Sequence, residues 1–477
     1  MHLQISTTDK IMNLKNSRIF STAFIFLLYS GLTHSQTLRS VDDKSGYEGA
    51  NVDPSLDNAL SSSGPLISAE EARTLSSSDD QRRTRRSANT YTYVRCYYQD
   101  PTPANGGSGF RTDYGSVLGY EWALNADGSY YSLDGYWGRR VSSNGINVFL
   151  YYTDVSKQEI KNTCERTIST KRNGKKFVKS FAANNRWSYN YDTWWNGENG
   201  SAFMYDRIIS FGDSLSDNQN FFNVTEWLAP NTNTWSLGRF SNGKVWTEYL
   251  ADEGFHIPLY NWAVGYSGTE RTRYNLIKGI GDQVDSFLES ISTNSSGYRI
   301  DRSLFTIFTG ANDIMTFNVP PSQIVSRQKA AIIKLLDQGA KNILVMNIPD
   351  VSKTPRYVSG SQAGELKAKV DQVNSGLVAM VDELKATYGG GLVRIVLFDT
   401  HAAFSGIINN PGDYRIKNTS ASCVDYSKKG AKIDYVSRFP TCSNPDEYVF
   451  WDTVHPTSIT HKLLAANVHA ALFVRNP

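Results

Sequence analysis

Short apolar runs alternate with segments of helical periodicity from about residue 204 to the end of the chain. The apolar runs lie at 207–211, 304–308, 343–347 and 393–398, and helical periodicity fills, for example, 322–338 and 362–386. Continuous apolar strands separated by helices are typical of a parallel sheet that helices cover on both faces. We therefore predict a three-layer α/β/α fold over 204–477, with the chemistry at the carboxyl ends of the strands.

Residues 89–200 differ in composition, because five of the ten tryptophans and many tyrosines fall there. Alternating runs such as 91–97, with glycine and asparagine turns between them, are typical of short β-strands. We predict a small β-rich domain over 89–200. Its aromatic side chains would form a core or, as the alternative, a surface that contacts lipid or sugar.

The N-terminal segment has the pattern of an export signal. Lys10, Lys15 and Arg18 precede an apolar run at 19–31 that is too short to cross a bilayer comfortably. We predict a signal peptide at 1–35 and hence a secreted, extracellular protein, with an uncleaved membrane anchor as the alternative. The polar segment 36–88 predicts a disordered linker or pro-segment.

A basic run closes this linker at Arg86, and it is either a processing site or a solvated stretch of charge. The whole chain carries a net charge of only +3, so charge gives no reason to expect a nucleic-acid partner. The motifs HExxH, Walker A and the dinucleotide-binding fingerprint are all absent. The sequence therefore predicts neither a metal nor a cofactor.

The four cysteines are Cys96, Cys164, Cys423 and Cys442, and no two of them form a CxxC pair. This spacing argues against a zinc or redox motif. The cysteines fall into two groups along the chain, so the pairing Cys96–Cys164 and Cys423–Cys442 is the natural prediction. An exported protein permits disulfides, and four free buried thiols are the alternative.

Two motifs together predict a catalytic triad. The strand at 207–211 runs into the sequence Gly-Asp-Ser-Leu-Ser-Asp, which places Ser214 at the carboxyl edge of the sheet, where a nucleophile is well positioned. Asp452 stands three residues before His455, so its carboxylate can orient Nδ1 of the ring while Nε2 takes the serine proton. His401, just past the strand at 393–398, is the rival base.

A tetrahedral intermediate also needs hydrogen-bond donors for its oxyanion. Gly265, in the run Asn-Trp-Ala-Val-Gly, and Asn312, directly after the strand at 304–308, can supply two donors. The backbone N–H of Ser214 can supply a third. Each motif alone is as compatible with an ordinary turn as with an oxyanion hole. The order of the motifs along the chain makes the whole set more specific.

The blocks GDSLSD, NWAVG, GAND and DTVHP resemble the four blocks of SGNH/GDSL hydrolases, and GRFSNG at 238–243 resembles the lipase subgroup. The resemblance covers about 205–477 and implies the SGNH fold. It also implies Ser214 as nucleophile, His455 as base and Asp452 as its acid, with Ser214, Gly265 and Asn312 as the oxyanion hole.

Over about 90–477 the chain is also similar to the thermolabile, lecithin-dependent haemolysins of Vibrio-like bacteria. The stretches TYTYVRCYY, DGSYYSLDGYW, FAANNRWSYN and FWDTVHPT carry this similarity. It implies phospholipase or lysophospholipase action on a membrane surface, and related enzymes use cholesterol as an acyl acceptor. Tyr266 stands where many relatives are expected to carry a second glycine, and its side chain would narrow the pocket.

The segment after the nucleophile is rich in apolar side chains, including Phe221, Phe222, Trp227, Leu228 and Trp235. This area favours a lipid substrate, with Phe221, Phe222 and Trp227 as candidate substrate-binding residues, unless the side chains simply pack the domain. The alternative function is a carbohydrate acetyl esterase, whose aromatic N-terminal domain would bind sugar. A non-catalytic binding protein is disfavoured, because a competent residue fills every triad and oxyanion position.

Overall fold

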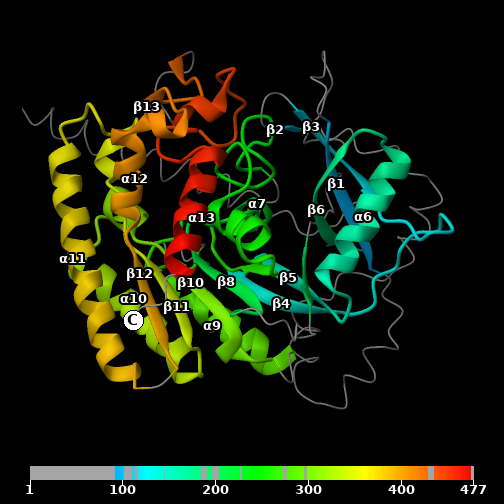
Figure 1. Cartoon of the computed structure of the whole chain (residues 1–477), viewed down its shortest axis with the longest axis horizontal. Helices are drawn as coiled ribbons and strands as arrows, with labels where there is room; N and C mark the ends of the chain where they lie inside the picture. Colours follow the sequence, from blue (N-terminus) through cyan, green and yellow to red (C-terminus); the bar gives the residue numbers. More distant parts are fainter. Residues whose placement is uncertain are drawn as a thin grey trace, which may run out of the picture. The chain divides into compact units, whose positions relative to one another are not determined.

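The computed structural model describes most of the chain after residue 91 (Figure 1). The described residues are 92–100, 110–112, 116–143, 146–183, 191–195, 204–225, 228–271, 277–294, 298–390, 392–427 and 434–473. The predicted signal peptide at 1–35, the predicted linker at 36–88 and its basic end at Arg86 lie outside these residues.

A five-stranded parallel sheet organises the C-terminal part of the molecule, in the order β12-β11-β10-β8-β9. Its strands are β8 (Arg207–Gly212), β9 (Leu259–Asn261), β10 (Ser303–Phe308), β11 (Asn342–Met346) and β12 (Arg394–Phe398). Chain order reverses at β8, since β9 lies on one side of it and β10 on the other. Ligands of such sheets bind at the carboxyl ends of the strands beside this reversal.

Helices cover both faces of this sheet. Alternate strand residues such as Ile209 and Phe305 belong to one buried cluster, together with side chains of α9 (Ile280–Asn294), α10 (Pro321–Asp337) and α11 (Ala363–Tyr388). Their neighbours Ile208 and Leu304 belong to a second cluster on the other face. That cluster includes side chains of α8 (Trp246–Tyr249), α12 (Thr400–Asn409) and α13 (Ser458–Phe473). The predicted three-layer α/β/α fold is confirmed.

Gly212 is the last residue of β8, and its position accepts only glycine. Its φ of +154° is rare for side-chain-bearing residues, and a Cβ atom there would lie 2.3 Å from the carbonyl oxygen of Phe308. The last residues of β8 and β10 can therefore pair closely, and the chain turns directly into Ser214.

Short elements connect the main ones. They are α7 (Asn220–Val224), η1 (Leu250–Phe255), η2 (Ile300–Arg302), η3 (Asp313–Phe317), η4 (Val351–Lys353), η5 (Pro411–Tyr414), β13 (Asn418–Ser422), η7 (Pro445–Glu447) and β14 (Tyr448–Phe450). The strands β13 and β14 form a separate parallel pair just before the Asp452–His455 segment.

The N-terminal part is β-rich, as predicted, and contains two small sheets of orders β2-β3-β1-β6 and β4-β5-β7. Its elements are β1 (Tyr93–Asp100), β2 (Phe110–Thr112), β3 (Ser116–Trp122), β4 (Tyr136–Ser143), β5 (Ile146–Thr153), α6 (Lys157–Lys171), β6 (Lys176–Ala183) and β7 (Asp192–Trp195). The Cys96–Cys164 disulfide joins β1 to α6 inside a buried cluster. Tyr97, Tyr120 and Trp122 pack edge to face or tilted in a second cluster, so these aromatic side chains form core.

The β-rich part shares buried core with the α/β part. Tyr152 of β5 and Trp194 of β7 belong to the same cluster as the residues of the main sheet. The rings of Trp194 and Tyr260 of β9 have centroids 4.3 Å apart, and Lys157 Nζ donates to the carbonyl oxygen of Leu259 at 2.9 Å. Strand β9 is therefore held from both sides.

Candidate active site

The structure brings Ser214, His455 and Asp452 together beside the end of β8. His455 Nε2 lies 2.8 Å from Ser214 Oγ, and His455 Nδ1 lies 2.8 Å from Asp452 Oδ2. All three side chains are buried, which strengthens electrostatic interactions between them. The rival base His401 lies in α12, and the histidine that contacts Ser214 is His455.

Asp452 accepts four hydrogen bonds. Its Oδ1 accepts from the backbone N–H groups of Val454 and His455 at 2.9 and 2.8 Å, and its Oδ2 accepts from His455 Nδ1 and from Trp235 Nε1 at 3.1 Å. Burial by itself raises the pKa of Asp452. The charge and hydrogen bond of His455 and the backbone donors outweigh burial, so the pKa lies below its ordinary value. The carboxylate is thus held ionised and in a fixed orientation.

The Trp235 donor was not predicted from the sequence, which indicated only apolar area at this position. Trp235 is fully buried in a cluster with Cys423, Val424, Tyr426, Phe439 and Trp451. The Cys423–Cys442 disulfide anchors the segment that supplies this cluster. Tyr435, from the same segment, packs on the Trp235 ring at 5.1 Å, and its Oη lies 3.4 Å from His455 Nδ1.

The GRFSNG stretch at 238–243 holds the histidine segment in place. The ring of Phe240 lies 5.0 Å from that of His455. Ser241 Oγ donates to the carbonyl oxygen of Pro456 at 2.9 Å, and Asn242 Oδ1 accepts from the backbone N–H of Ser458 at 2.7 Å. This motif therefore contacts the His455 ring and the residues that follow it, and it helps to fix their position.

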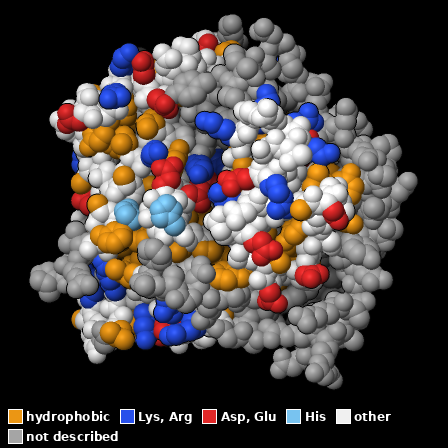
Figure 2. Space-filling model, turned by 45° about the vertical axis from the view of Figure 1, so that its right-hand side comes forward, with side chains coloured by type: hydrophobic (Ala, Val, Ile, Leu, Met, Phe, Trp, Pro, Cys, Tyr) orange, Lys and Arg blue, Asp and Glu red, His pale blue; other side chains and the backbone are white. Residues whose placement is uncertain are grey.

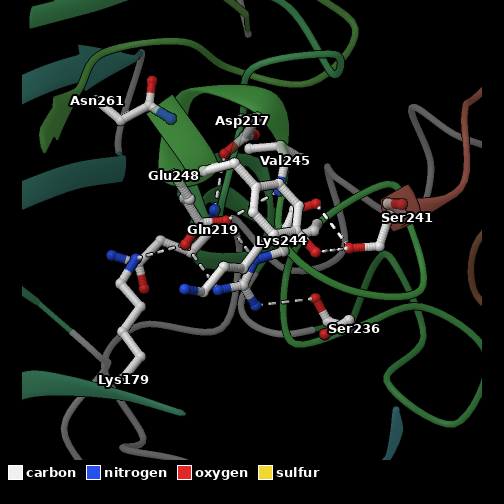
Figure 3. A network of polar contacts seen from close by, with 12 residues as sticks. Lys179, Asp217, Gln219, Ser236, Ser241, Lys244, Val245, Glu248 and Asn261 are labelled. Atoms are coloured by element: carbon white, nitrogen blue, oxygen red, sulfur yellow. Dashed lines mark hydrogen bonds and ion pairs between the residues drawn. The ribbon is translucent and has the colours of Figure 1, made fainter. Parts of the chain in front are cut away.

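A buried ion pair fixes the GRFSNG stretch. Arg239 donates to both carboxylate oxygens of Glu248, at 2.6 and 2.8 Å. Figure 3 shows Lys179 of β6 reaching toward the same carboxylate, 3.9 Å away. Burial raises the pKa of Glu248, but the Arg239 charge and hydrogen bonds outweigh it and bring the value to about 2.

The predicted oxyanion donors do not all point where the sequence suggested. The Gly265 N–H donates to Asp217 Oδ2 at 2.7 Å, so it is already used by a buried carboxylate. Gly265 has a packing role instead, because a Cβ atom there would lie 2.4 Å from the Phe240 ring. Asn312 Nδ2 donates one hydrogen to the carbonyl oxygen of Ser267 at 2.9 Å, which orients the amide. The second hydrogen of the same amide can then be donated to a substrate oxygen. Within the described residues, the Ser214 N–H has no protein acceptor.

Two buried carboxyl groups, those of Asp213 and Asp217, flank the turn that holds Ser214. Burial raises the pKa of Asp213 to about 7, against the opposing effects of the Leu215 N–H and the charge of His455.

Burial also raises the pKa of Asp217 to about 6. Asp217 nevertheless accepts backbone hydrogen bonds from Gln219, Asn220, Phe221 and Gly265. These carboxyls shape the turn around Ser214.

Tyr266 occupies a backbone conformation that favours glycine, with φ of +65°. A glycine, which we expect at this position in many relatives, would adopt this conformation without strain. Its side chain is 39% exposed and packs edge to face on Phe317, with ring centroids 5.3 Å apart. Tyr266 therefore presents an aromatic ring next to the site at a cost in backbone strain of about 1 kcal/mol.

The candidate substrate-binding aromatics are not exposed. Phe222 lies in a cluster with Tyr97 and Leu237, and the Phe221 ring packs on Phe240 with centroids 5.5 Å apart. Both side chains are at most 2% exposed, so they pack the molecule rather than form the open apolar surface expected from the sequence. The third candidate, Trp227, lies outside the described residues.

Within the described part of the chain, no cluster of three or more His, Cys, Asp or Glu side chains could hold a metal ion. In the same part, no helix is both long and apolar enough to cross a bilayer.

Comparison with known proteins places this chain in a family. The sequence profile described as GDSL-like lipase/acylhydrolase matches residues 208–468, and the Vibrio dual lipase/transferase N-terminal domain matches residues 61–196. The thermolabile hemolysin of Vibrio parahaemolyticus is 36% identical over 386 residues, which cover 79% of this chain and 86% of that protein.

Two further relatives match a smaller share of the chain. The phosphatidylcholine-sterol acyltransferase of Aeromonas hydrophila is 25% identical over 57% of this chain and 91% of its own length. The secreted effector protein SseJ of Salmonella typhimurium is 31% identical over 54% of this chain and 62% of its own length. The chain belongs to the GDSL-like lipase/acylhydrolase family and is a serine hydrolase that acts on ester bonds.

Proposed function

We propose that this protein hydrolyses acyl ester bonds of glycerophospholipids through an acyl-enzyme on Ser214. The observation that carries the proposal is the pair of 2.8 Å contacts that link Ser214 Oγ, His455 and Asp452. Nucleophile, base and orienting acid stand in the order that acyl transfer requires.

In the first half-reaction, Ser214 Oγ attacks the ester carbonyl carbon while His455 Nε2 takes its proton. His455 then passes this proton to the departing glycerol oxygen, and the acyl group remains on Ser214. In the second half-reaction, water attacks the acyl-enzyme with His455 again as base, and Ser214 is released. Asp452 keeps the ring in the tautomer that leaves Nε2 free to accept a proton.

The developing oxyanion is stabilised by the Ser214 N–H and by the second hydrogen of the Asn312 amide. Gly265 acts in this proposal mainly by letting Phe240 approach, since its own N–H is donated to Asp217. Donors that are fixed in advance are effective because they need no reorganisation when charge develops.

A lipid substrate is supported by the relatives named a thermolabile hemolysin and a phosphatidylcholine-sterol acyltransferase. In a lipid-rich setting, the hydroxyl of cholesterol replaces water in the second half-reaction and makes the protein an acyltransferase. A carbohydrate acetyl esterase is the competing function. Trp122 and Trp194 of the N-terminal part are buried in core, so these two rings do not offer the exposed aromatic surface that a sugar-binding module needs.

We also propose that the protein is secreted, with 1–35 as signal peptide, 36–88 as linker, 89–200 as β-rich domain and 204–477 as hydrolase domain. The two disulfides support an oxidising compartment, because such bonds persist outside the cytosol.

The test is product analysis by mass spectrometry after incubation with a defined phosphatidylcholine, with and without cholesterol. Wild-type protein should release fatty acid, and cholesteryl ester should form only with cholesterol. Ser214→Ala should lower turnover by several orders of magnitude. Ser216→Ala is the matched control, because Ser216 is also buried but accepts a hydrogen bond from Trp246 Nε1. Faster turnover of acetyl than of long-chain p-nitrophenyl esters, with no phospholipid cleavage, would favour the acetyl esterase.

A further inference from the structure

We propose that Arg356 binds the phosphate group of the substrate and so selects phospholipids over neutral esters. The inference rests on the proposed function, since it names the part of a glycerophospholipid that this residue recognises. Arg356 lies outside the four sequence blocks. Neither its spacing from them nor its neighbours in the sequence identify it as a binding residue.

A backbone hydrogen bond links Arg356 to the catalytic segment, residues 452–455. Its N–H donates to the carbonyl oxygen of Thr453 at 3.0 Å, and Thr453 directly follows Asp452. Arg356 lies in the turn after η4 (Val351–Lys353), which itself follows the carboxyl end of β11. The turn therefore reaches the same edge of the sheet as Ser214.

The guanidinium is available to a ligand. Arg356 is exposed, and within the described residues it forms no ion pair with a carboxylate. Its guanidinium carbon lies 5.3 Å from the centroid of the Tyr357 ring, and this buried ring supports it from one side. Several other arginines are already paired, such as Arg271 with Asp282 and Arg327 with Glu270.

The positive charge of Arg356 affects two tyrosines near the proposed catalytic residues, Tyr266 and Tyr435. Burial raises the pKa of the Tyr266 and Tyr435 hydroxyls, and the charge of Arg356 opposes that rise at both. Tyr435 Oη is 3.4 Å from His455 Nδ1, and Tyr266 follows Gly265. Arg356 is thus within electrostatic reach of two rings that adjoin the reacting groups.

A phosphodiester suits this position. It is an anion that lies a few bonds from the acyl esters of the same glycerol, and a guanidinium offers it a fork of N–H donors. The exposed side chains of Tyr266 and Val358 supply apolar surface next to the charge. On the face drawn in Figure 2, Lys and Arg side chains are interspersed with Asp and Glu, so that face has no broad basic surface that would attract anions without selection.

The experiment compares Arg356→Gln with the wild type on two soluble esters. Dihexanoyl phosphatidylcholine, used below its critical micelle concentration, carries a phosphate without a membrane surface, and p-nitrophenyl butyrate carries none. Arg356→Gln should lose about tenfold or more in kcat/KM on the phospholipid, mainly through KM, and should change less than about twofold on the neutral ester. Arg356→Lys should fall between the two, because it keeps the charge without the fork.

Lys353→Gln is the matched control, since Lys353 is an exposed cation three residues away. It should leave both activities unchanged. As a second readout, glycerophosphocholine should inhibit butyrate hydrolysis competitively in the wild type and more weakly in Arg356→Gln. Inorganic phosphate alone should inhibit less than glycerophosphocholine if the whole headgroup is bound.

Equal phospholipid kinetics for Arg356→Gln and wild type would overturn the role of Arg356 and leave the proposed function standing. A wild type that cleaves butyrate but no phosphatidylcholine would overturn both. Equal loss on both esters would also refute phosphate recognition, because it would mean that the substitution damages the catalytic segment.

Discussion

Replacing Trp235 with Phe isolates the hydrogen bond that the indole donates to the carboxylate of Asp452, the proposed acid of the triad. Phe retains most of the ring that packs on Tyr435 and Phe439 but lacks the donor that lies 3.1 Å from Asp452 Oδ2. Asp452 then keeps three of its four donors. Hydrogen bonds to charged groups contribute about 1.5–3 kcal/mol, so the free energy of unfolding should fall by about that amount.

The effect on catalysis should be smaller than removal of the Asp452 charge. His455 Nδ1 and two backbone N–H groups still hold the carboxylate, so its position loosens without being lost. A cost of about 1–2 kcal/mol in the transition state corresponds to about a 5- to 30-fold fall in kcat. KM for p-nitrophenyl butyrate should change little, because Trp235 is buried and lies behind the acid rather than against substrate.

The assay combines steady-state kinetics with urea unfolding, and Trp451→Phe is the control. Trp451 belongs to the same buried cluster, but its Nε1 has no hydrogen-bond partner among the residues that the structure describes. Both variants lose similar packing, and only Trp235→Phe loses a donor to Asp452. If the two variants showed the same kcat, the hydrogen bond would have no role in positioning the acid.

Three further predictions concern the surrounding groups. Asn312→Ala should lower kcat by about 10²–10³ with a much smaller change in KM; normal kcat with raised KM would mean that Asn312 only binds substrate. Because the folded-state pKa of Asp213 is raised from 3.8 to about 7, the stability it contributes is complete below about pH 4 and is lost as pH rises through 7. Asp213→Asn should therefore be more stable relative to wild type at about pH 8 than at about pH 5 in urea unfolding, and a difference that does not vary with pH would contradict this. Replacing Cys423 and Cys442 together with Ser should cost about 3 kcal/mol, since the bond closes a 19-residue separation; free thiols in non-reducing peptide mapping of the exported protein would contradict the premise.

The sheet strands could be predicted from sequence because burial on both faces leaves a continuous apolar run. The runs at 207–211 and 304–308 correspond to β8 and β10 within one residue at each end. Strand β9 was not predicted, since its three residues, Leu259–Asn261, are too few to show a pattern. Its place in the sheet depends on tertiary contacts, such as the Trp194–Tyr260 pair.

The contact between Ser214 and His455 could be anticipated because each residue lies in a local motif. The environment of Asp452 could not, because Trp235 lies 217 residues away and has no sequence pattern that marks its N–H as a donor. The direction of the Gly265 N–H likewise depends on Asp217, 48 residues earlier. Roles of side chains and N–H groups that depend on contacts between distant parts of the chain thus could not be predicted from the sequence.

The buried contact of β5 and β7 with β9 limits how this chain could be divided or recombined. A protein cut at residue 204 would lose Tyr152 and Trp194 from the main cluster and would leave Tyr260 uncovered beside β8. The α/β part of this chain therefore depends on the β-rich part for some of its buried core. A chimera that joins the N-terminal part of one relative to the hydrolase part of another should fold well only when the side chains on both sides of this contact are transferred together.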